Sequence, residues 1–230
     1  MNTVYEQVTT ISFFQYNTFK SKLWAFGMMQ YAHAHLSKAK GCTFYKLMGT
    51  GKGNGFNPWP DFSTYSLLMV WDSIDEAEVF INNSTLYARY NDQTSAITTH
   101  FMHCLKSHGE WSKQNPFKTV TYDIDESNNI GVITRATIKK RFLPKFWSYV
   151  PTSSKPLKDN ENLLFKKGIG ETPILQMATF SIWEEIDAIK QYAYKSKEHA
   201  EAIKITRKLG WYKEELFARF VILKESKNGF

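Results

Sequence analysis

The fold of this chain is decided by a segment that occurs twice, first as Met69–Ala77 (MVWDSIDEA) and again as Ser181–Ile189 (SIWEEIDAI). In both copies an apolar run ends in a tryptophan, and two polar residues, an isoleucine and an aspartate follow it. Trp71 and Trp183 are 112 positions apart, and the isoleucines and aspartates keep this spacing. A pattern that recurs at one spacing predicts a fold assembled from two equivalent halves.

Two further pairs of segments occur in the same order nearer the N-terminus of each half. Gly49–Gly51 resembles Gly168–Gly170 at a spacing of 119, and Leu23–Phe26 resembles Phe146–Tyr149 at a spacing of 123. The smaller spacing near the tryptophans indicates that the first half carries a longer connection, which we place at 52–61. Together the three pairs indicate an internal duplication.

Each half is predicted to contain the same succession of secondary structure. In the first half, apolar and β-branched runs predict strands, and helical spacing predicts helices, at 9–16 (strand), 20–38 (helix), 42–48 and 65–71 (strands), 74–90 (helix) and 100–105 (strand). In the second half the corresponding segments are 129–137 (strand), 144–150 (helix), 163–167 and 175–183 (strands), 186–208 (helix) and 215–223 (strand).

The order βαββαβ is that of a ferredoxin-like unit, and a four-stranded sheet of this kind has one apolar face to bury. We therefore predict an α+β fold in which two tandem ferredoxin-like repeats pack as a dimeric-α/β-barrel-type structure within one chain. The polar stretch Gln114–Pro116 marks the predicted boundary, which divides the chain into 1–114 and 115–230.

Composition sets the broad class. The chain has 230 residues, of which 43 % are hydrophobic and 22 % charged, as in soluble globular proteins and unlike disordered or fibrous ones. Two cysteines and the lack of a CxxC motif favour the reducing cytoplasm, and we identify neither a leader peptide nor a run long enough to span a membrane.

The net charge of +7 favours an acidic or anionic partner, although the lysines are spread along the chain rather than gathered in a nucleic-acid-binding patch. We expect no nucleic acid. Aromatic residues make up 16 % of the sequence, which fits either a wide apolar ligand or an aromatic core.

A glycine-rich run, Gly49–Gly55 (GTGKGNG), invites comparison with phosphate-binding loops. It lacks the GxxxxGK[ST] pattern, and a proline-rich segment and a strand follow it instead of a helix. We interpret it as a flexible loop that covers an apolar site.

Four C-terminal blocks and two N-terminal ones resemble the spheroidene monooxygenase family over residues 9–223. The blocks are Thr134–Ile138 with Phe146, Trp147 and Pro151; Gly168–Pro173 leading into Ala178–Trp183; Tyr192–Lys195 with His199; Trp211–Phe220; Leu23–Met29; and Lys46–Gly51.

The resemblance implies a monooxygenase that binds a b-type haem and hydroxylates an acyclic carotenoid at C2, so that a ketone is formed. It also implies an external electron donor such as ferredoxin. Because a carotenoid does not dissolve in water, we expect a cytoplasmic protein with peripheral contact to the inner face of the membrane, and a homo-oligomer fits this interpretation. The alternatives are a haem enzyme with another reaction (aldoxime dehydration or peroxide use), a non-enzymatic haem-binding protein, and a cofactor-free barrel oxygenase.

The resemblance makes His199 the candidate axial ligand of the haem iron, because it lies beside the apolar stripe of the predicted helix 186–208. The alternative is a histidine at the edge of the core that bonds a carbonyl. His199 aligns with Tyr87 at the spacing of 112, so the first half has no imidazole at the equivalent place. We therefore expect one haem per chain, in residues 115–230, with residues 1–114 as scaffold.

Arg135 is the candidate catalytic residue and a candidate haem contact, since a buried guanidinium requires a partner. A propionate or iron-bound oxygen would supply one, and a salt bridge with Glu171 or Glu184 is the alternative. Tyr194, Trp211 and Arg219 are further candidates for cofactor binding. At the position after Tyr194, where the family is expected to have an arginine, this chain has Lys195, which lacks the planar guanidinium for a bidentate contact.

Overall fold

The computed structural model describes residues 6–53, 57–125, 128–154, 160–189 and 209–229. The strands of the described chain are β1 (Val8–Gln15), β2 (Cys42–Gly51), β3 (Pro60–Trp71), β4 (Ala96–Gly109), β5 (Ile130–Ile138), β6 (Leu163–Thr172), β7 (Gln176–Trp183) and β8 (Tyr212–Gly229). Its labelled helices are α1 (Phe19–Tyr31), α2 (His33–Leu36), α3 (Ile74–Asn83), α4 (Thr85–Gln93) and α5 (Leu143–Ser154), with a 3-10 turn η1 at Lys140–Phe142. Residues 186–189 are also helical, and the remainder of the helix predicted at 186–208 lies outside the described residues.

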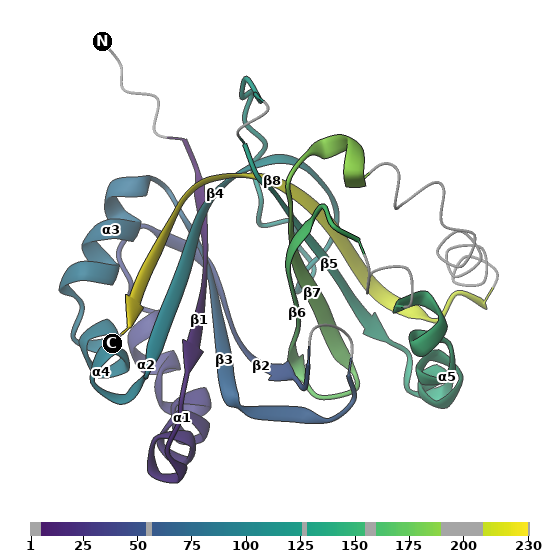
Figure 1. Ribbon diagram of the computed structural model, residues 1–230, viewed down its shortest axis with the longest axis horizontal. Coiled ribbons are helices and arrows are strands. Elements are labelled where there is room, and N and C mark those ends of the chain that lie inside the picture. Colours follow the sequence, from purple (N-terminus) through teal and green to yellow (C-terminus); the bar gives the residue numbers. More distant parts are fainter. Residues whose placement is uncertain (1–5, 54–56, 126–127, 155–159, 190–208, 230) are drawn as a thin grey trace.

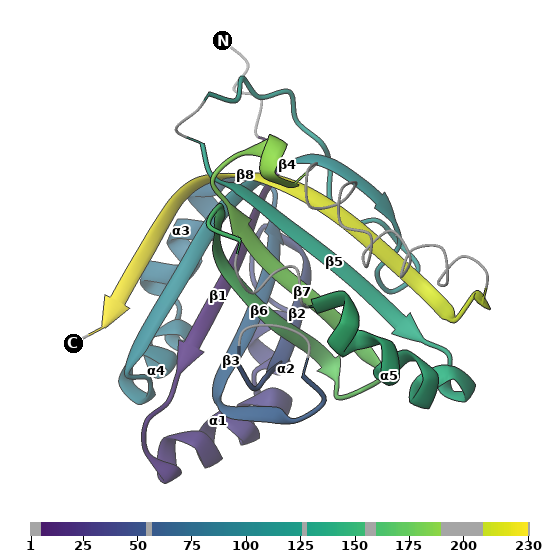
Figure 2. The same cartoon turned by 45° about the vertical axis from the view of Figure 1, so that its right-hand side comes forward.

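The eight strands form one closed antiparallel barrel in the order β1-β3-β2-β6-β7-β5-β8-β4 (Figures 1 and 2). The first half contributes β4-β1-β3-β2, and the second contributes β8-β5-β7-β6, which is the same order. This α+β barrel built from two ferredoxin-like sheets confirms the predicted fold class. Closure pairs the outer strands of the two sheets with each other, β4 with β8 and β2 with β6.

The two seams between the halves differ in length. β4 and β8 pair along the whole of β4. The β2–β6 seam is short, because the backbone pairing there places only Gly49 opposite Gly170 and Thr50 opposite Ile169. The barrel wall is therefore continuous at the β4–β8 seam. At the other seam β2 and β6 diverge from each other on leaving their two paired positions.

Alternating side chains divide the apolar residues between the inside and the outside of the barrel. Phe13 points inward, whereas its neighbour Phe14 packs under the helices of the first half. The interior core draws on every strand and includes Ile11, Phe13, Phe44, Met48, Leu68, Val70, Met102, Cys104, Ile133, Ile169, Ala178, Phe180, Leu216 and Phe220. The outer core of the first half includes Phe14, Tyr16, Ala25, Met28, Leu67, Met69, Trp71, Leu86, Tyr87 and Tyr90.

The structure corrects several predicted boundaries. The helix predicted at 74–90 is two helices, because Ser84 has extended backbone and its side chain accepts the N–H of Tyr87 at 3.1 Å, which starts α4. The strands predicted at 100–105 and 215–223 extend to Ala96–Gly109 and Tyr212–Gly229. The long β4–β8 ladder provides backbone hydrogen bonds for the polar ends of both strands, whose sequences show no alternating pattern.

Candidate functional site

A cavity of about 290 Å³ lies where the walls diverge at the β2–β6 seam. The seam strands, the start of β3, the β6–β7 turn and α1 surround it. Its apolar lining includes Phe26, Met29, Tyr65, Ile169, Ile174 and Met177, and its polar lining includes Glu171 and Gln176. An apolar cleft with a few converging polar groups is the usual form of a small-molecule site.

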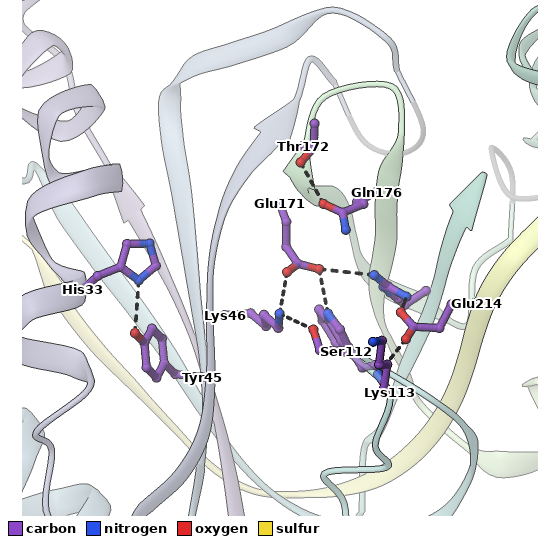
Figure 3. Close-up of polar contacts among 11 residues, drawn as sticks. His33, Tyr45, Lys46, Ser112, Lys113, Glu171, Thr172, Gln176 and Glu214 are labelled. Atoms are coloured by element: carbon purple, nitrogen blue, oxygen red, sulfur yellow. Dashed lines mark hydrogen bonds and ion pairs between the residues drawn. The ribbon is translucent and has the colours of Figure 1, made fainter. Parts of the chain in front are cut away.

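Glu171 connects this cavity to a group of charged side chains inside the barrel (Figure 3). Its carboxylate accepts Lys46 Nζ at 2.6 Å and Trp111 Nε1 at 2.7 Å. Lys46 also donates to Ser112 Oγ at 2.7 Å. These bonds hold the carboxylate in one orientation, because each of its oxygens has a fixed donor.

Arg135 lies deeper in the same group and is 2 % exposed. Its guanidinium pairs with Glu214 and lies 3.5 Å from Glu171 Oε1, and it sits 5.6 Å from the ring centre of Trp111. Burial alone would raise the pKa of Glu214, but the backbone N–H of Lys113 and the charge of Arg135 outweigh it and lower that pKa. A buried arginine is tolerated here because two carboxylates compensate its charge.

The loop after β4 closes this end of the barrel interior. Ser112 and Lys113 both have positive φ, at 59° and 65°, which is an unfavourable backbone conformation for residues other than glycine. The bonds of the charged group stabilise it, since Lys46 bonds Ser112 and Glu214 accepts the Lys113 N–H at 2.7 Å. The segment that joins the two halves is thus anchored to both of them.

The predicted site residues do not converge on one place. Arg135 points into the barrel, whereas Arg219 faces outward, because its neighbours Ala218 and Phe220 belong to the interior core. Trp211 is buried under α5, where its ring centre lies 5.5 Å from that of Phe146.

His199 and Tyr194, together with Lys195, lie outside the described residues. Their roles in haem binding therefore stay predictions. Of the two carboxylates considered for Arg135, Glu171 is a partner and Glu184 is exposed. The second partner, Glu214, was not predicted.

The barrel interior also contains His100, and its surroundings show whether a haem fits there. The His100 ring packs against Phe180 and Phe165, with ring centres 5.6 and 6.1 Å away, and the seam cavity does not reach it. Its Nδ1 is buried without a hydrogen-bond partner in the described structure, and burial lowers its pKa. These rings leave no space for a porphyrin plane beside His100.

Sequence comparison decides the family, although no family model matches the chain. The chain is 35 % identical to spheroidene monooxygenase of Cereibacter sphaeroides over 221 residues, which cover 94 % of this chain and 67 % of that protein. It is 31 % identical to the spheroidene monooxygenase of Rhodobacter capsulatus over 217 residues, which cover 94 % of this chain and 90 % of that protein. The chain belongs to the spheroidene monooxygenase family. The resemblance inferred from the sequence blocks is confirmed.

Solved structures place this family member on a known barrel. An aldoxime dehydratase in complex with butyraldoxime superimposes with a TM-score of 0.64, covering 99 % of this chain and 83 % of that one. A second aldoxime dehydratase structure gives a TM-score of 0.63. The sequence identities are 10 % and 9 %, so the likeness shows the fold alone and says nothing about activity.

Sequence reasoning missed the interior roles of Lys46, Glu214 and His100 in this spheroidene monooxygenase homologue. A usable signal exists for Lys46 and Glu214, since each lies two residues from an inward apolar residue, Phe44 and Leu216 respectively. His100 carries the same signal, because it lies two residues from the inward Met102. Trp111 gave no such signal, because it lies in a loop outside any strand pattern.

The described residues offer neither a metal-binding cluster nor a membrane-spanning helix. No group of three or more histidine, cysteine or acidic side chains is placed to bind a metal ion within that part of the chain. No helix in the same residues has the length and apolar character needed to cross a bilayer. Cys42 and Cys104 are free, and burial raises their pKa values to about 11 and about 12, so both thiols stay protonated.

Proposed function

We propose that this spheroidene monooxygenase homologue oxygenates an acyclic carotenoid at C2 and converts that methylene group to a ketone. Family membership carries the proposal, because the two relatives named above are spheroidene monooxygenases. Each of two successive hydroxylations consumes one O2, two electrons and two protons and releases one water. The resulting geminal diol loses water to form the ketone. A small redox protein such as a ferredoxin is the proposed donor.

The seam cavity is the proposed site for the reacting end of the substrate. Its apolar walls suit a hydrocarbon, and its volume of about 290 Å³ lies near the lower end of small-molecule sites. A cavity of this size holds one end of a long polyene, while the remainder stays outside. This arrangement fits a reaction at the end of the chain.

The charged group behind the cavity has a positioning role in this proposal. Lys46 and Trp111 hold Glu171, so that a fixed polar wall limits how deeply an apolar chain enters. Arg135 holds Glu171 and Glu214 from the other side. We assign Arg135 to this structural role, since both terminal nitrogens of its guanidinium are already paired with carboxylates.

The proposed cofactor is a b-type haem, which when bound would supply activated oxygen. Its support is the sequence block that contains His199. Because aromatic rings fill the space beside His100, the interior histidine, we place the haem on the outer side of the second half, the side that Arg219 faces. This side begins at Met177, which lines the seam cavity, and extends to Ile189, the last described residue before the segment that carries His199.

The test is product analysis in a bacterial host that makes an acyclic carotenoid and no oxygenated one. We expect products with one oxygen gained and two hydrogens lost per ketone, and a Soret band in the purified protein. A haem-loaded, reduced and folded protein that yields no oxygenated carotenoid would overturn the proposed reaction. In that case a substrate panel of aldoximes and peroxides separates another reaction from simple haem binding.

A matched pair of variants tests the cavity itself. A Cβ at Gly49 meets nothing within 4 Å, so Gly49→Val adds side-chain volume at the cavity with no clash at its Cβ. We expect it to reduce ketone formation at least about tenfold with the fold intact. Val79→Ser alters an exposed apolar side chain on α3 and should leave product formation unchanged.

A further inference from the structure

Helix α1 carries apolar side chains on both of its faces. Ala25 and Met28 are buried against the barrel. On the opposite side Phe19, Leu23 and Phe26 are 84 %, 61 % and 61 % exposed. They follow one another at spacings of four and three residues, which places them in one stripe along the helix. A surface helix with an exposed apolar stripe in addition to its buried face indicates a contact surface.

The stripe continues onto the start of β3. The rings of Phe26 and Phe62 have centres 6.5 Å apart, and Phe62 is exposed as well. Trp59, directly before β3, is 70 % exposed. We call Phe19, Leu23, Phe26, Trp59 and Phe62 the aromatic face.

The chain segment that carries most of the aromatic face has charges of a single sign. From residue 7 to residue 60 the sequence contains six lysines and no aspartate or glutamate. Lys20 and Lys52 are exposed and form no ion pair within the described part of the chain. Asp61, the first acidic residue after this stretch, is paired with Lys167 at 3.2 Å.

The corresponding part of the second half has the same character. Residues 128–154 contain five basic residues and no acidic one. Lys140 and Lys145 are exposed, as is Tyr149 on α5. Figures 1 and 2 both show α1 and α5 at the same end of the barrel, to either side of the β6–β7 turn. Helices α1 and α5 therefore both present basic and aromatic side chains at this end of the barrel.

The seam cavity opens within this end of the barrel. Phe26 and Phe62 of the aromatic face belong to its lining, and so does Ile174 in the β6–β7 turn. Ile174 is exposed, and its carbonyl accepts the Trp147 indole N–H of α5 at 3.3 Å. A molecule that entered the cavity would therefore pass the aromatic face.

We propose that the aromatic face, flanked by Lys20 and Lys52, docks onto the surface of a bilayer that contains anionic lipids, so that an apolar substrate passes from the bilayer into the seam cavity. Exposed aromatic and leucine side chains enter the headgroup region, and lysines beside them bind the anionic headgroups. The passage of substrate rests on the proposed function, whereas the docking itself does not. An acidic protein would match the lysines but not the exposed aromatic rings.

The test is cosedimentation of the full chain with vesicles of phosphatidylcholine alone or mixed with phosphatidylglycerol. We expect binding to the mixed vesicles that weakens as salt is added, and little binding to phosphatidylcholine. The double variant F19S/L23S changes two exposed residues that do not line the cavity, and K20E/K52E reverses two charges. Each should weaken binding at least about tenfold, and Val79→Ser should bind like the unaltered chain.

Activity provides an independent readout. With substrate supplied in vesicles, F19S/L23S should form less ketone, while with substrate in detergent it should match the unaltered chain. Vesicle binding without any carotenoid oxidation would refute the proposed function and leave the docking surface standing. Absent vesicle binding would overturn the docking proposal, and so would self-association that F19S/L23S abolishes, because a second copy would then cover the face.

Discussion

Arg135 and Arg219 lie on adjacent strands, β5 and β8, and point to opposite sides of the barrel wall. Arg135 is opposite Leu216, an interior residue, and Arg219 is opposite Val132 on the outer side of the second half. One bound group cannot lie against both guanidinium groups. The two arginines predicted to share a cofactor therefore have separate roles, and each can be tested by itself.

Replacing Arg135 should affect stability. Arg135→Met leaves Glu171 and Glu214 without their buried cation, and we expect the free energy of unfolding to fall by about 3 kcal/mol. Urea unfolding measures it, with Lys20→Met as an exposed control expected to change by less than about 0.5 kcal/mol. Equal stability of the Arg135 and Lys20 variants would contradict this assignment.

Haem retention should depend on the outer side of the second half. We expect His199→Ala to lose bound haem and Arg219→Met to weaken retention, while Arg135→Met keeps haem in its folded fraction. Tyr87→Phe should retain one haem per chain, because the Tyr87 hydroxyl is occupied by Ser12 at 3.1 Å and Thr99 at 2.8 Å. Pyridine haemochrome counting decides these outcomes. Two haems per chain, or full occupancy in His199→Ala, would exclude the predicted ligand.

His100 should make stability depend on pH. Burial, opposed by Glu225 and assisted by Lys227, lowers its pKa below the ordinary value of 6.5, so the unfolded chain binds its proton first as the pH falls. Its contribution to stability is therefore complete above pH 6.5 and is lost progressively as the pH falls through and below that value.

Urea midpoints above and below pH 6.5 measure this dependence. His100→Leu should reduce the loss of stability on acidification, whereas His35→Leu, at an exposed histidine, should retain it. The same slope in the His100 variant and the unaltered chain would show that other groups cause it.

The two glycines that face each other across the short seam should tolerate a methyl group differently. At Gly170 an added Cβ would lie 2.6 Å from the Gln176 carbonyl oxygen, while at Gly49 nothing lies within 4 Å. We expect Gly170→Ala to cost about 1–3 kcal/mol and Gly49→Ala less than about 0.5 kcal/mol. Thermal unfolding of both variants gives the comparison, and similar losses would show that the seam adjusts freely.

Much of the architecture follows from local pattern. The duplicated segment around Trp71 and Trp183 ends β3 and β7, which occupy equivalent places in the two sheets. Alternation along each strand assigns side chains to one face or the other, and that alternation is a property of neighbouring residues. Helix breaks were harder to predict, since Ser84 ends one helix and caps the next within an otherwise helical pattern.

The sequence by itself determined the repeated segments, the α+β class, the family and the stretch without acidic residues that contains α1, because these depend on residue order and composition alone. Only the tertiary structure decided that β4 pairs fully with β8 while β2 barely meets β6, and so where the cavity lies. It also decided that Lys46, Trp111 and Arg135 meet at Glu171, and that Arg135 pairs with Glu214 as well. These residues are far apart in the chain, and barrel closure, which is a long-range property, brings them together.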